Sequence, residues 1–143
     1  MIKRLSIEEV ESIAHMLAKK LMDWDEPIPK FSTRFENKLE SCLETPFMGY
    51  GGETFYRGLK KKAAILFYLL VKNHPFQNGN KRIAVTALLV FLMKNNKWLS
   101  VDTQEFYNFA VWVAESPPAL KEDTVNAIAS FIEQNMVESR VRS

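Results

Sequence analysis

The sequence has almost no cysteine, which limits both its chemistry and its compartment. A single cysteine, Cys42, stands among 143 residues, so the chain cannot form an internal disulfide. This usage is typical of a reducing compartment, and we expect a cytoplasmic protein. Because Cys42 lies in a helical, mostly apolar segment, we expect a buried thiol rather than a reactive one.

Long hydrophobic runs are also missing. The longest, residues 83–93, is too short to span a bilayer. Residues 1–6 lack the apolar centre of a signal peptide. We therefore expect neither a membrane span nor a secretory leader.

A large excess of charge of one sign is absent as well. The net charge of +2 is too small to indicate nucleic acid or an anionic membrane as a partner. A solvated helix face explains the one basic run, Lys60 to Lys62, so we expect no direct nucleic-acid binding. The sequence also lacks a Gly-x-x-x-x-Gly-Lys phosphate loop, a cysteine-based nucleophile and a cluster of metal ligands.

What the sequence does contain is a series of helical patterns joined by short connections. A length of 143 residues, with 47% hydrophobic and 25% charged residues, predicts one globular domain over residues 1–143. Apolar residues recur at helical spacing in about six segments, which predicts an all-α compact bundle. The predicted helices run from residue 6 to before Pro27, and over about 33–43, 59–72, 79–94, 102–114 and 121–136.

Local signals mark where these helices start and stop. Three capping boxes pair Ser6 with Glu9, Thr33 with Glu36, and Asp102 with Glu105. Asn78 is predicted to cap the fourth helix. Residues 44–56 contain Pro46 and three glycines, which predicts a loop or a small hairpin. The polar tail, residues 138–143, is predicted to fray.

The most informative stretch is residues 74–82, His-Pro-Phe-Gln-Asn-Gly-Asn-Lys-Arg, just before a long apolar helix. Helix starts carry partial positive charge and favour acidic residues, yet this one has Lys81 and Arg82 and no acid. Backbone N–H groups beside two cations make a phosphate site, and Gly79 would let the backbone approach a phosphate closely. His74 is then placed to act as a base beside the phosphate.

Each residue of this stretch also has a simpler interpretation. In that interpretation His74 caps backbone carbonyls and Asn78 is only an N-cap. Gly79 forms a tight turn, and Lys81 and Arg82 are solvated charges. Together these roles leave the cationic helix start unexplained, whereas phosphate binding accounts for it. Under either interpretation we expect Phe76 to be a core anchor, and Pro75 to push His74 toward an extended conformation.

These nine residues resemble the signature of the Fic/Doc (Fido) family, His-x-Phe-x-acid-Gly/Ala-Asn-Gly/Lys-Arg. The resemblance is clearest over residues 39–99 and implies a Fido-type helical fold with a small β-hairpin flap. It also implies ATP-dependent modification of protein hydroxyl groups, with Mg²⁺. By this resemblance His74 is the base and Arg82 the transition-state cation. The implied nucleotide- and phosphate-binding residues are Asn78, Gly79, Asn80 and Lys81.

Residues 47–56 resemble the flap of the family, a small hairpin that holds the target chain beside the histidine. The implied target-binding residues are Tyr50, Gly51, Gly52, Glu53, Thr54 and Phe55.

Two positions relate the motif to the Doc (death-on-curing) toxin branch of the family, and a third departs from the family pattern. Lys81 stands where AMP-transferring members usually carry Gly, and Val85 stands where they usually carry a second Arg. Both favour transfer of a phosphoryl group to a Ser or Thr hydroxyl of a cellular protein, by this resemblance one of the translation machinery. Asn78 stands where many members carry an acid that holds Mg²⁺, so the resemblance implies a weaker metal site at Asn78.

Two alternative functions stay open at this point. One is AMP transfer by the same fold, and the other is a binding module with weak or no catalysis. Ser32-x-x-x-Glu36-Asn37 also fits the inhibitory pattern of the family, in which the glutamate pairs with the motif arginine. Doc-type toxins more often receive this segment from a separate antitoxin, so we expect a small antitoxin protein as a partner.

Overall fold

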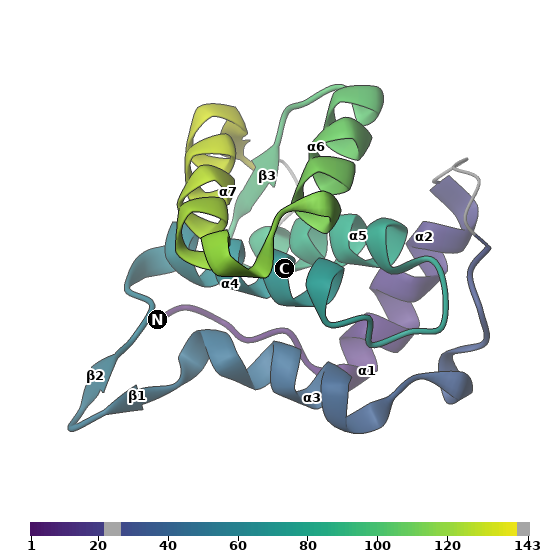
Figure 1. Ribbon diagram of the computed structural model, residues 1–143, viewed down its shortest axis with the longest axis horizontal. Coiled ribbons are helices and arrows are strands. Elements are labelled where there is room, and N and C mark those ends of the chain that lie inside the picture. Colours follow the sequence, from purple (N-terminus) through teal and green to yellow (C-terminus); the bar gives the residue numbers. More distant parts are fainter. Residues whose placement is uncertain (22–26, 140–143) are drawn as a thin grey trace.

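Two apolar helices, α4 (Gly58–Lys72) and α5 (Asn80–Lys94), form the centre of the fold (Figure 1). Residues 62–71 of α4 are all buried, as are nearly all of residues 82–92 of α5. Because these helices have almost no polar face, each must be covered on several sides. The computed structural model describes residues 1–21 and 27–139.

The remaining helices pack around this central pair. The first one combines α1 (Ile7–Glu9), a π-helical stretch (Val10–His15) and α2 (Met16–Leu21), which follow one another without a break. The other outer helices are α3 (Glu36–Glu44), α6 (Thr103–Glu115) and α7 (Lys121–Asn135). In Figure 1, α6 and α7 lie above the central pair, and α3 lies below it. Six helices within the described residues confirm the predicted all-α bundle.

The glycine-punctuated segment before α4 forms the predicted hairpin. Strand β1 (Gly49–Tyr50) pairs antiparallel with β2 (Glu53–Thr54). The two residues between them, Gly51 and Gly52, have φ values of +61° and +84°. Two-residue hairpin turns with positive φ at both positions match the twist of the strands, and glycine adopts them without strain. The hairpin projects from the bundle at the lower left of Figure 1.

A second strand pair was not predicted from the sequence. Strand β3 (Lys97–Leu99) pairs antiparallel with β4 (Met136–Glu138). The N–H of Ser139 also donates to the carbonyl of Asn96, at 3.1 Å. The prediction of a frayed tail from residue 138 is therefore wrong for residues 138 and 139, and residues 140–143 lie outside the described part of the chain.

Of the three predicted capping boxes, one forms fully, one forms only on the side of its N-cap residue, and one is wrong. Ser6 and Glu9 make the predicted capping box, and the Asp102 carboxylate accepts from two N–H groups of the first turn of α6. The box of Thr33 and Glu36 is wrong. Thr33 belongs to a separate 3₁₀ turn, where its hydroxyl donates to a carbonyl three residues back at 2.6 Å, and α3 begins only at Glu36.

The cysteine prediction is confirmed and the solvated-lysine prediction is partly wrong. Cys42 is fully buried, and burial raises the pKa of its thiol to about 12. Lys60 lies at the surface, where its ammonium pairs with Glu133 at 2.9 Å, and Lys61 is exposed. Lys62 is only 6% exposed, because it faces the base of the hairpin rather than solvent.

Candidate active site

The loop between α4 and α5 exposes His74 to solvent, while the two residues that follow it are buried. The side chains of Pro75 and Phe76 are buried, and Phe76 is the core anchor expected from the sequence. His74 is exposed and has a φ of +49°, so the expected extended conformation is wrong. Positive φ is uncommon for a residue with a side chain, and such conformations concentrate at functional sites.

Asn80, the first residue of α5, closes this loop on itself. Its Oδ1 accepts from the N–H of Phe76 at 3.0 Å, and its Nδ2 donates to the carbonyl of Phe76 at 2.9 Å. These two bonds fix the orientation of the amide. The same Nδ2 lies 3.3 Å from Nδ1 of His74, so neutral His74 accepts there and carries its proton on Nε2. The proton-accepting nitrogen is therefore the one beside Asn80.

Gly79 occupies the N-cap position of α5, so the prediction of Asn78 as the cap is wrong. Its φ of +72° is left-handed, which favours glycine over asparagine at this position. A Cβ at Gly79 would lie 2.6 Å from Cδ1 of Ile28 and 2.8 Å from the carbonyl oxygen of Pro27. The close approach that Gly79 permits is therefore made by the chain itself in this structure.

The two motif cations lie in different surroundings. Lys81 is partly exposed, whereas Arg82 is only 7% exposed. The Nη2 group of Arg82 donates to the carbonyl of Ala18 in α2, at 2.5 Å. One turn further along α5, the Thr86 hydroxyl donates to the carbonyl of Ala14 at 2.8 Å. Arg82 thus ties α5 to the first helix here, while His74 and Asn80 face each other at the loop.

The hairpin exposes aromatic side chains but lies away from His74. Tyr50 is 85% exposed and Phe55 is 64% exposed, so both are available for contact with another molecule. The hairpin precedes the first residue of α4, and His74 follows its last. A helix of 15 residues spans about 22 Å. The hairpin and the motif loop lie toward opposite ends of the molecule in Figure 1.

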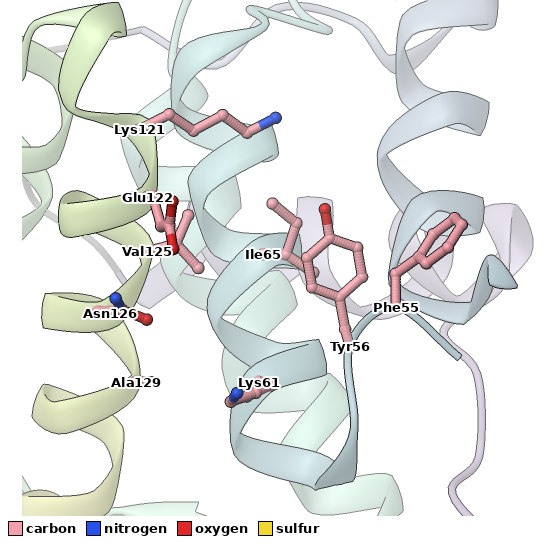
Figure 2. Close-up of a pocket in the computed structure, with 9 residues that line it drawn as sticks. All are labelled: Phe55, Tyr56, Lys61, Ile65, Lys121, Glu122, Val125, Asn126 and Ala129. Carbon is pink, nitrogen blue, oxygen red and sulfur yellow. The ribbon is translucent and has the colours of Figure 1, made fainter. Parts of the chain in front are cut away.

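A groove of about 350 Å³ adjoins the hairpin (Figure 2). Its apolar part comes from Ile65 of α4 and from Val125 and Ala129 of α7, beside Phe55 and Tyr56. The other lining residues are Lys61, Lys121, Glu122 and Asn126. No residue of the motif lines this groove, and the sequence analysis missed it because its walls come from segments about 60 residues apart.

The inhibitory pattern in the sequence does not make the expected contact. The side chain of Glu36 is 66% exposed and lies 3.5 Å from Nη2 of Arg34. The guanidinium of Arg82 instead lies against α2. In this structure Glu36 therefore does not pair with the motif arginine.

The described residues offer little for a metal ion by themselves. Among residues 1–21 and 27–139, no three His, Cys, Asp or Glu side chains are grouped as a metal site. The amide of Asn78 is exposed beside the helix start, and an amide oxygen is a neutral ligand for a hard cation. A magnesium ion here would depend mainly on phosphate oxygens. None of the described helices is long and apolar enough to cross a membrane.

The comparison with protein families agrees with this arrangement. The model of the Fic/DOC family matches residues 4–92, which include the hairpin, α4, the whole motif loop and all but the last two residues of α5. The chain belongs to the Fic/DOC family. Fic/DOC proteins transfer nucleotide-derived groups to proteins, use ATP with a divalent metal, and often pair with antitoxins. No curated protein and no solved structure matches the chain.

Proposed function

We propose that this Fic/DOC protein transfers the γ-phosphoryl group of ATP to a Ser or Thr hydroxyl of a cellular protein, as a Doc-like toxin acting on the translation machinery. A small antitoxin protein would hold it inactive. The observation that carries phosphoryl transfer over AMP transfer is Val85. This side chain is 0% exposed within the core, so the position that would supply a second phosphate-binding arginine is apolar and closed.

The start of α5 supplies the phosphate site in this proposal. Glycine at the N-cap brings no side chain of its own to the first turn, where the backbone N–H groups of Asn80 and Lys81 point along the helix axis. The ammonium of Lys81 offsets the negative charge that moves to the leaving group. Mg²⁺, held by the phosphate oxygens and Asn78, would neutralise further charge on the triphosphate.

His74 acts as the general base in the transfer step. The attacking hydroxyl first displaces the Nδ2 of Asn80 from Nδ1 of His74. Nδ1 then takes the proton of the hydroxyl, while the hydroxyl oxygen forms a bond to the γ-phosphorus. The bond from that phosphorus to the bridging oxygen breaks, and ADP leaves. The hydrogen bond from Asn80 orients the imidazole before the hydroxyl arrives. Arg82 supplies the transition-state cation, and in the free protein its Nη2 donates to the carbonyl of Ala18.

The hairpin serves as a docking surface for the target in this account. Because it lies about the length of α4 from His74, the target would be held at two separated points. Tyr50 and Phe55 at the hairpin and the apolar groove beside them would contact one part of the target. Ser32 and Glu36 are not needed for inhibition, since the antitoxin would supply the blocking segment.

Labelled ATP distinguishes the possible reactions. Purified protein is incubated with a bacterial lysate and ATP labelled on either the α or the γ phosphate. Phosphoryl transfer predicts label in protein from the γ position only, and His74→Ala should reduce it by about 10²–10⁴-fold. Gln77→Ala, an exposed substitution in the same loop, is the matched control and should transfer normally.

Two other outcomes would replace the proposal. Label from the α phosphate would show AMP transfer instead. Label from neither position, with equal growth inhibition by the wild type and His74→Ala, would favour a binding module without catalysis. The uncharged Asn78 is the residue that favours this non-catalytic alternative.

A further inference from the structure

Lys62 lies at the base of the hairpin and bonds to both of its arms. Its ammonium donates to the carbonyl of Pro46 at 3.1 Å, to the hydroxyl of Thr54 at 2.9 Å and to the carbonyl of Tyr56 at 2.6 Å. Pro46 precedes β1, Thr54 belongs to β2, and Tyr56 follows β2. One side chain from α4 therefore holds the entry and the exit of the hairpin together.

The Lys62 ammonium is held by hydrogen bonds to neutral groups of the hairpin. An ammonium group has three N–H donors, and the three oxygen acceptors satisfy all of them. Among the described residues no carboxylate pairs with it, although the Phe47 ring lies 5.1 Å from its Nζ. Burial lowers the pKa of Lys62, and the nearby charge of Arg4 lowers it further. Burying a cation against neutral groups is costly, so the three bonds are its main compensation.

The hairpin has few other contacts that fix its direction. Its two strands have two residues each, and isolated two-stranded hairpins are only marginally stable. Beyond the strand pairing, the N–H of Phe55 donates to the carbonyl of Met48 at 3.0 Å. The Thr54 hydroxyl that receives Lys62 also lies 3.3 Å from that carbonyl and 3.4 Å from the Tyr56 carbonyl. Lys62 is thus bound to the point where the two arms meet.

We propose that Lys62 is a positioning residue, which sets the direction of the hairpin relative to α4 and so presents Tyr50 and Phe55 to the target protein. The part that concerns the target rests on the proposed function. The part that concerns the hairpin does not, because it is a property of the free protein. Lys62 acts only through the hairpin and touches neither ATP nor His74.

Amide hydrogen exchange in the free protein tests the structural part. In Lys62→Met the N–H of Phe55 should exchange about tenfold faster or more, since the bonds of a charged group are lost. Lys61→Met is the matched control, because Lys61 is the adjacent residue and is exposed. It should leave the Phe55 exchange rate unchanged. Amides in the middle of α5 should exchange at the wild-type rate in both variants.

A second variant covers the case in which Lys62→Met fails to fold. Thr54→Val removes the central acceptor and keeps the lysine, and it should also accelerate exchange at Phe55. If Phe55 exchanges at the wild-type rate in the folded Lys62→Met or in Thr54→Val, Lys62 does not hold the hairpin and the proposal is overturned. Equal acceleration in Lys61→Met would overturn it as well.

The transfer assay then separates positioning from catalysis. With γ-labelled ATP and increasing amounts of lysate protein, Lys62→Met should need about tenfold more lysate for half-maximal labelling. The ATP concentration for half-maximal labelling and the maximal rate should match the wild type, because the motif loop is untouched. A lower maximal rate with unchanged half-saturation would contradict positioning. If the wild type labels nothing, the transferase proposal fails, while the exchange experiment still decides the role of Lys62.

Discussion

Gly79 is the residue at which backbone conformation and packing both exclude a side chain. Its φ is +72°, and a Cβ would meet Ile28 and the Pro27 carbonyl at less than 3 Å. Gly79→Ala should therefore lower the free energy of unfolding by about 3 kcal/mol or more, from backbone strain and a forced shift of residues 27 and 28. Urea unfolding followed by circular dichroism measures the change.

Gly51 provides the matched comparison for this prediction. Its φ of +61° is similar, but nothing lies within 4 Å of a Cβ built there. Gly51→Ala should cost only the left-handed strain of about 1 kcal/mol. Equal losses at the two glycines would mean that the contact between Gly79 and residues 27 and 28 contributes nothing.

Single residues show where sequence reasoning succeeds and where it fails. Phe76 and Cys42 could be predicted as buried because apolar side chains in apolar segments seldom have another place. Lys62 was predicted as solvated because a charge is usually exposed, and nothing local in the sequence shows the three oxygen atoms that receive it. The positive φ of His74 was missed because the residue before a proline normally favours extended backbone.

At the scale of elements, the first helix contacts α5 near both ends of α5. Near the motif, the carbonyls of Ala18 and Ala14 accept from Arg82 and Thr86. At the other end of α5, the ammonium of Lys94 lies 2.6 Å from the Glu9 carboxylate. The first helix thus runs alongside α5 in the opposite direction, and any movement of Arg82 toward a nucleotide is coupled to this contact.

The contact between Glu9 and Lys94 predicts a pH dependence of stability. Burial alone would raise the pKa of Glu9, but hydrogen bonds from Lys94 and the Ser6 backbone, with the charge of Lys94, bring it below its ordinary value of 4.5. A lowered pKa in the folded state contributes stability above pH 4.5, and this contribution is lost as the pH falls through the lowered value. Glu9→Gln should therefore cost about 1 kcal/mol at pH 7, because the pair is only partly buried.

Urea unfolding at pH 7 and at pH 3 checks this prediction. The stability difference between the wild type and Glu9→Gln should shrink at pH 3, below the ordinary pKa of 4.5, where the unfolded chain binds the proton. Glu8→Gln is the control, since Glu8 is exposed in the same turn. Its substitution should change the free energy of unfolding only slightly at both pH values. A difference for Glu9→Gln that grows on acidification would contradict the assignment.

The approximate positions of the helices followed from the sequence, but the start of α3 and the long-range pairing of the strands did not, and the predicted end of the first helix lies outside the described residues. Helices α4 and α5 could be predicted because their apolar runs end at polar or proline-containing loops. The pairing of β3 with β4 joins residues about 40 positions apart, and neither strand is long enough to show a strand pattern by itself. Thr33 was wrongly predicted as a cap because a capping box and a 3₁₀ turn use the same polar residues.

At the scale of the whole molecule, the Fic/DOC motif lies at one end of α4, and the hairpin that we propose to bind the target lies at the other. The sequence could predict both features, because each has a local signature. It could not predict their separation, since the family resemblance implies a target held beside the histidine. Helix α4 separates the two by about 22 Å, so the proposed function predicts that target recognition and group transfer can be impaired independently.

The central claim is that the start of α5 binds the phosphates of ATP next to His74. A crystal structure of the chain with Mg²⁺ and a non-hydrolysable ATP analogue tests it most directly. The account predicts the terminal phosphates against the backbone N–H groups of Asn80 and Lys81, with the imidazole of His74 facing the γ-phosphorus. A nucleotide bound elsewhere on the molecule, or a loop of residues 74–82 that stays without phosphate at saturating analogue, would contradict it.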